Sequence, residues 1–105
     1  MELAENPFEK SNLVLRLERN QREARQLKNK LSSYLCEPRT YNLFERSETL
    51  KSGLERLSDT NDEIIQALRE KKKSVEEYME SVKQQFTMFH ELQQGVQDYV
   101  QGMRS

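Results

Sequence analysis

Residues 37–45, which read EPRTYNLFE, decide the fold because they place a proline between two long stretches with helical periodicity. Inside a helix, Pro38 would remove a backbone hydrogen bond and clash with the preceding turn. Residues 37–42 are therefore predicted to form a connection. Asn42 followed three residues later by Glu45 is typical of a helix start, which predicts that a second helix begins at Leu43.

The stretch before the proline predicts a first helix over residues 7–36. Asn6-Pro7-Phe8-Glu9 has the same start pattern, with Asn6 as the N-cap and Pro7 at the first helical position. Residues on one stripe then recur with alternating spacings of four and three, and only Asn20 among them is polar. The stripe consists of Leu13, Leu17, Asn20, Ala24, Leu27, Leu31 and Tyr34. A narrow stripe with charged flanks indicates a coiled-coil seam.

A longer seam follows the connection and predicts one helix over residues 43–103. Fourteen of its 18 seam positions, from Leu43 to Met103, are apolar, and their phase never shifts. A period of 3.5 residues kept over this length favours left-handed supercoiling. Residues 58–62 are poor helix formers, so a kink there stays open. The expected fold is an all-α, elongated coiled coil of two helices, one short and one long, in a single domain over residues 1–105.

The last third of the predicted long helix carries a wide, aromatic apolar stripe. A first helix of roughly 45 Å that folds back covers only about half of a long helix of roughly 90 Å. The uncovered apolar face would need a partner to bury it. The predicted partner-binding face consists of Val75, Tyr78, Val82, Phe86, Phe89, Leu92, Val96, Tyr99, Val100 and Met103. Phe89→Asp is therefore expected to abolish assembly while the N-terminal half stays helical.

Three polar residues in the seams are predicted to set the register of the helices: Asn20, Asn61 and Gln85. A buried polar group at a seam position costs stability and commonly fixes register and partner choice. Asn61→Leu is therefore expected to raise stability and to loosen the choice of oligomer. A loss of more than about 1 kcal/mol would instead indicate a satisfied hydrogen bond.

Composition excludes several classes of partner. Apolar residues make up 34% of the 105 residues and charged residues 33%, whereas an ordinary globular domain is roughly 45–50% apolar. The net charge of −1 gives no general attraction to nucleic acid or to an anionic membrane, and no apolar run is long enough to insert into a bilayer. Cys36, the only cysteine, cannot form an internal disulfide, which favours an intracellular location in the cytoplasm or nucleus.

The sequence contains no recognisable catalytic, metal-binding or cofactor-binding motif. The three glycines are too far apart for a phosphate loop, and one histidine with one cysteine cannot form a structural zinc site. Cys36 and His90 lie far apart in the chain, and the carboxylates are spread along polar helix faces. We therefore expect a non-enzymatic protein without a cofactor.

Three interpretations of function follow, and all of them involve binding to protein helices. The first is a structural or adaptor subunit of a hetero-oligomeric helical assembly, which the wide stripe favours. The second is a homo-oligomeric coiled-coil spacer. The third rests on Gln85, which lies between apolar layers and resembles the central glutamine of the SNARE family; this implies a helix that zippers or tethers in membrane traffic. Lys71 departs from that family's apolar layers, and no membrane anchor follows.

Overall fold

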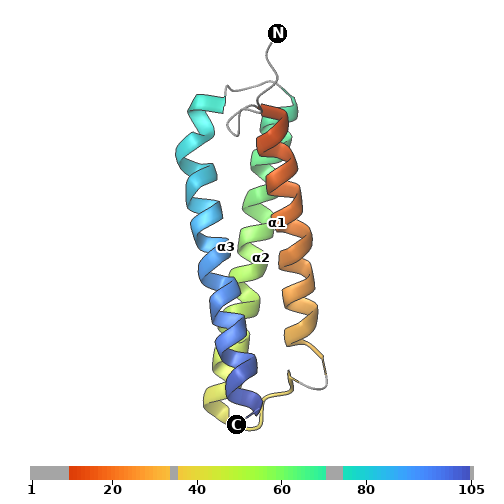
Figure 1. The fold of residues 1–105 in the computed structure, drawn as a ribbon, viewed down its shortest axis with the longest axis vertical. Coiled ribbons are helices and arrows are strands. Elements are labelled where there is room, and N and C mark those ends of the chain that lie inside the picture. The colour runs from red at the N-terminus through yellow and green to blue at the C-terminus, as the bar shows by residue number, and fades with distance from the viewer. Residues whose placement is uncertain (1–9, 34–35, 71–74, 105) are drawn as a thin grey trace.

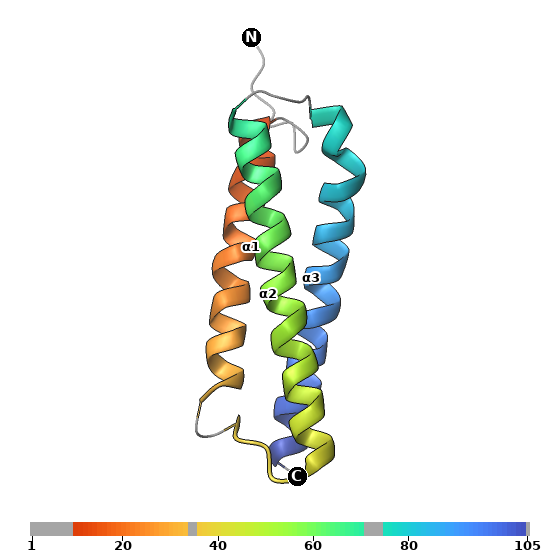
Figure 2. The same ribbon diagram turned by 180° about the vertical axis from the view of Figure 1, so that it is seen from behind.

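The structure is a bundle of three antiparallel helices. This computed structural model describes residues 10–33, 36–70 and 75–104, with the backbone alone for 103 and 104. The helices are α1 (Lys10–Leu31), α2 (Tyr41–Arg69) and α3 (Val75–Arg104). They run side by side, α1 and α3 in one direction and α2 in the other (Figures 1 and 2). These ranges contain no strand, so the prediction of an all-α, elongated fold is confirmed.

The predicted long helix over residues 43–103 is wrong, because α2 ends at Arg69 and α3 begins at Val75. The bundle is 55 Å long, much shorter than the roughly 90 Å that one helix of that length would span. The residues between the two helices, Glu70 to Ser74, are all polar and include three lysines. Folding back gives the apolar stripe of α3 two helices of its own chain to pack against.

The ends of the first two helices also differ from the sequence prediction. Helix α2 begins two residues early, because Thr40 rather than Asn42 is its N-cap and accepts a hydrogen bond from the Leu43 amide at 3.1 Å. Helix α1 ends at Leu31 rather than at residue 36. The Ser33 hydroxyl donates to Lys30 O at 2.8 Å, and so competes for a carbonyl at the helix end. The predicted start at Asn6 lies outside the described residues.

The predicted break at Pro38 is confirmed, and the alternative kink at 58–62 does not interrupt the helix. Pro38 lies between α1 and α2, outside both helices. Residues 58–62 lie within α2 and are helical throughout. Asn61 faces the core in this stretch and is fully buried, so packing against the neighbouring helices offsets the weak helix propensity.

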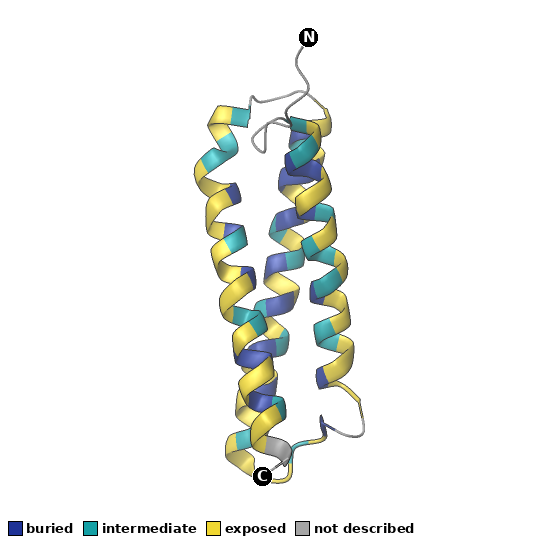
Figure 3. Cartoon of the chain, in the orientation of Figure 1, coloured by how far each residue is buried: buried dark blue, intermediate teal, exposed yellow. Residues whose placement is uncertain are grey.

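Buried residues lie on the inner faces of the three helices (Figure 3). Their apolar side chains form two clusters. The first cluster lies where α1 begins and α2 ends, and contains Leu13, Val14, Leu17, Ile64, Ile65, Leu68 and Val82. The second lies towards the opposite end, and contains Ala24, Leu31, Leu50, Leu54, Leu57, Phe89, Val96 and Tyr99. The Tyr99 hydroxyl donates to Cys36 O at 2.9 Å, which ties α3 to the connection between α1 and α2.

Ser47 is a polar residue in the core whose hydroxyl has no hydrogen-bond partner among the described residues. Its side chain is only 1% exposed. Ser47→Ala removes the unpaired buried hydroxyl and improves helix propensity, so it is expected to raise the free energy of unfolding by about 1 kcal/mol. Urea unfolding measures the change. The exposed Ser52→Ala on the same helix controls for propensity, and an equal gain in both variants would contradict the effect of burial.

Candidate protein-binding surfaces

The stripe predicted to bind a partner lies mostly inside the bundle. Val82, Phe89, Val96 and Tyr99 are buried among α1 and α2, between 1% and 3% exposed. Val75, Tyr78, Phe86, Leu92 and Val100 are half-buried and pack against the two core clusters. The side chain of Met103 lies outside the described residues. The premise that no part of this chain could cover the stripe is therefore wrong, and its role in binding a partner stays a prediction.

Two of the three predicted register residues meet in a polar layer between the apolar clusters. Gln85 of α3 donates from Nε2 to Asn61 Oδ1 of α2 at 2.6 Å and to Leu57 O at 3.0 Å. Asn61 Nδ2 lies 3.5 Å from Leu17 O of α1, the long limit of a hydrogen bond. Both amide side chains are buried, 0% exposed for Asn61 and 5% for Gln85. The layer thus links all three helices.

This geometry changes what the register residues are expected to do. Asn61 is hydrogen-bonded inside its own chain, so its removal is expected to lower stability, opposite to the sequence expectation. Gln85, the residue that resembles the SNARE glutamine, finds its partners in α2 of the same molecule. Asn20 is half-buried on α1 and makes none of the three hydrogen bonds described for the layer.

Two glycines let α2 and α3 approach closely. A Cβ at Gly53 of α2 would lie 2.7 Å from Leu92 Cδ2, and one at Gly95 of α3 would lie 2.9 Å from Leu50 Cδ2. Both distances are shorter than carbon atoms tolerate. Each glycine lies beside the seam of its helix and leaves room for a neighbouring helix to come close. That neighbouring helix belongs to the same chain.

A graded response to alanine is expected at the three glycines. Gly102→Ala meets no atom within 4 Å and should stabilise α3 by up to about 1 kcal/mol. Gly53→Ala should be close to neutral, because the half-buried Leu92 can turn towards solvent. Gly95→Ala should cost about 1–3 kcal/mol, because Leu50 is buried and cannot yield. Thermal unfolding of the three variants checks this order, and equal effects would contradict it.

Ion pairs join α1 to α2 on the surface. Lys28 Nζ lies 2.5 Å from Glu55 Oε1, and Arg69 pairs with Glu18. The hydrogen bond from Lys28, together with its charge, lowers the pKa of Glu55. A lowered carboxyl pKa contributes stability at neutral pH that is lost as the pH falls through that pKa. The contribution is small because both side chains are largely exposed.

Among the residues whose side chains the structure describes, four large apolar ones are exposed. Tyr41 is 70% exposed and Leu15 59%, and Phe44 and Met88 are exposed as well. Tyr41 and Phe44 are three residues apart in the first turn of α2, so they share one side of the helix. The sequence analysis did not single them out, because Tyr41 precedes the predicted start of the second helix and Phe44 lies far from the last third of that helix, where the wide apolar stripe was recognised.

The chemically reactive residues are dispersed. Cys36 is buried in the connection between α1 and α2. His90 is exposed on α3, and its ring centroid lies 6.0 Å from that of Phe89, edge to face. Among residues 10–33, 36–70 and 75–104, no group of three or more His, Cys, Asp or Glu side chains is placed to hold a metal ion. No helix in these ranges is long and apolar enough to cross a membrane.

No family model, no curated protein and no solved structure matches this chain. The functional argument therefore rests on the surfaces of the bundle itself.

Proposed function

We propose that this chain is a non-enzymatic, protein-binding helical subunit, an adaptor or structural component of a hetero-oligomeric helical assembly inside the cell. Left-handed supercoiling of its helices, with the 3.5-residue period of their seams, belongs to the same proposal. The chain folds its own core and offers its outer surface to partners. It does not need a partner to complete that core.

The observation that carries the proposal is the aromatic pair, Tyr41 and Phe44, at the start of α2. Both rings are exposed although the bundle buries two apolar clusters. Aromatic side chains supply large contact areas at low entropic cost and are enriched among the residues that dominate binding energy. Two such rings on one side of a helix turn give a partner a place to pack.

The test compares three purified forms of the full chain: the unmodified protein, Tyr41→Ser with Phe44→Ser, and a control with Asn42→Ser and Glu45→Ser in the same helix turn. Thr40 and its capping bond are unchanged in all three. Each form is used as bait under mild cross-linking in source cells, and light scattering measures its mass in solution.

The proposal expects partner proteins that the unmodified and control chains retain and that the aromatic variant loses. If the unmodified chain has the mass of a homodimer and the aromatic variant has the mass of a monomer, the homo-oligomeric spacer would be supported instead. A partner set unchanged by the loss of both rings, or a monomer that retains no partner, would contradict the assignment.

A further inference from the structure

We propose that the outer groove between α1 and α2 binds an acidic amphipathic helix of a partner protein. This inference rests on the protein-binding function proposed above, but it concerns a surface separate from the aromatic pair. It names the chemistry of the partner from the charges and apolar groups that line the groove.

The charges of this nearly neutral chain are separated between its helices. Helix α1 carries seven basic residues, Lys10, Arg16, Arg19, Arg22, Arg25, Lys28 and Lys30, against two acidic ones, Glu18 and Glu23. Helix α3 carries two basic and five acidic residues. Because the helices lie side by side, the imbalance becomes a basic side of the bundle, which the net charge of the whole chain conceals.

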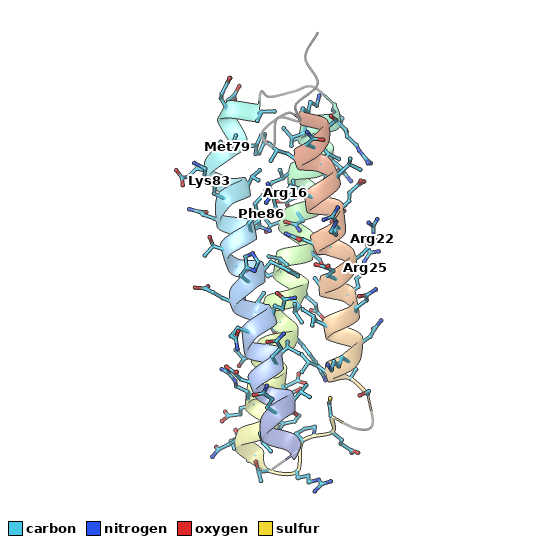
Figure 4. The ribbon with its side chains drawn as sticks, in the orientation of Figure 1. Arg16, Arg22, Arg25, Met79, Lys83 and Phe86 are labelled. Carbon is cyan, nitrogen blue, oxygen red and sulfur yellow. The ribbon has the colours of Figure 1, made fainter. Side chains whose placement is uncertain are left out.

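Three arginines of α1 form no ion pair with the described residues of the bundle. Lys28 pairs with Glu55, and the Arg16 guanidinium lies 4.4 Å from the centre of the Phe86 ring. Arg19, Arg22 and Arg25 are exposed, and none forms an ion pair within the described ranges. Arg22 and Arg25 project from the edge of α1 that faces away from α3, whereas Arg16 turns towards Phe86 (Figure 4). Guanidinium groups bind carboxylates with two parallel hydrogen bonds.

Two adjoining depressions run along this side of the bundle. The first, of about 630 Å³, is lined by Lys10, Ser11, Val14, Leu15, Glu18 and Arg69. The second, of about 390 Å³, is lined by Glu18, Gln21, Arg22, Arg25, Asp62, Ile65, Gln66 and Arg69. They share the Glu18–Arg69 ion pair, so they form one groove that this pair crosses. Basic residues outnumber the acidic Glu18 and Asp62 in its lining. Its exposed apolar residue is Leu15, and Val14 and Ile65 are nearly buried in its floor.

The lining favours a protein helix over a nucleic acid or a membrane. Leu15 is 59% exposed in the depression that adjoins the one lined by Arg22 and Arg25, and an apolar side chain gains nothing from a phosphate. Glu18 and Asp62 lie in the groove and would repel a continuous phosphate backbone, and the net charge of −1 supplies no long-range attraction. A helix with apolar residues on one face and flanking carboxylates would satisfy both Leu15 and the arginines.

The probe is a synthetic helical peptide with leucine along one face and glutamate on both flanks, titrated into the isotope-labelled full chain. A peptide of scrambled order, a single-stranded oligonucleotide and phosphatidylserine vesicles are titrated in parallel. The helical peptide is expected to shift the amide resonances of Leu15, Arg22 and Ile65, and to bind more tightly than the scrambled one.

Arg22→Glu with Arg25→Glu is expected to weaken this binding about tenfold or more. The matched control, Arg56→Glu with Lys83→Glu, reverses two exposed charges outside the groove and should leave the affinity unchanged. Equal binding of the two peptides, shifts confined to α3, or tighter binding of the oligonucleotide or the vesicles would overturn the proposal. The proposed function would survive that outcome if partners retained by the bait still depend on Tyr41 and Phe44.

Discussion

Phe89→Asp is expected to unfold the whole bundle, because Phe89 lies in the larger apolar cluster, which contains residues of all three helices. Its ring is 3% exposed. Truncating a buried phenylalanine to alanine costs about 3–5 kcal/mol, and a domain is stabilised by only about 5–15 kcal/mol in total. A buried carboxylate adds its own desolvation penalty. The helical signal in far-UV circular dichroism should therefore fall over all three helices together.

The control for this substitution is Gln94→Asp on the exposed side of α3. Gln94 donates to Asp98 at 3.1 Å, so the change replaces one surface hydrogen bond by a like-charge pair four residues apart, worth about 0.2–0.5 kcal/mol. If Phe89→Asp instead keeps a native helical signal and loses only its association with another molecule, the sequence interpretation of this stripe as an interface is right and the intramolecular core is wrong.

The positions of the apolar stripes could be predicted from the sequence. Leu54, Leu57, Leu68, Val82 and Val96 were placed on the seam by their spacing, and all of them are buried. The spacing is informative because a helix in any bundle must put its apolar side chains on one side. The confirmed break at Pro38 had an equally local cause, since proline cannot donate the hydrogen bond that a helix interior needs.

The reversal of the chain between α2 and α3 could not be predicted from the same pattern. Leu68 and Val75 are one heptad apart, so the seam keeps its phase whether the helix continues or ends. The segment between them contains neither proline nor glycine, the usual signals of a break. Two features of the sequence indicated that the helix ends there. Lys71 stands at a seam position, and one continuous helix would have an apolar face that no other segment could cover.

The polar layer formed by Asn61 and Gln85 depends on that reversal, whereas the groove between α1 and α2 depends on the turn at Pro38. In one continuous helix, Asn61 and Gln85 would lie roughly 36 Å apart, so their hydrogen bond was invisible to periodicity. The groove between α1 and α2 mixes residues from distant parts of the chain, Arg22 and Arg25 with Asp62 and Ile65. A net charge counted along the sequence does not show which charges share a side of a bundle.

The effects of replacing Asn61 and Gln85 by leucine are expected to be strongly coupled. The losses of stability in the two single variants should add up to more than the loss in the double variant. Asn61→Leu takes one hydrogen bond from the Gln85 amide and leaves Leu17 O without its contact. Gln85→Leu leaves Asn61 Oδ1 buried without its donor. Each unpaired buried group costs about 1–3 kcal/mol. The double variant removes both members, so its cost should be smaller than the sum by about 0.5–3 kcal/mol.

Urea unfolding of the unmodified protein, the two single variants and the double variant measures the coupling. The free-energy cost of fitting a larger leucine at residue 61 cancels, because it is common to the single and double variants. Asn20→Leu, on α1 outside the layer, should change stability by no more than about 0.5 kcal/mol.

The double variant joins the two apolar clusters into one, and no polar contact then opposes a shift of α2 against α3 by a heptad. Its amide resonances should therefore lose dispersion while the helical signal remains, since a satisfied polar layer selects one register among several apolar ones. Additive single effects, or a double variant with fully dispersed resonances, would show that packing alone fixes the register.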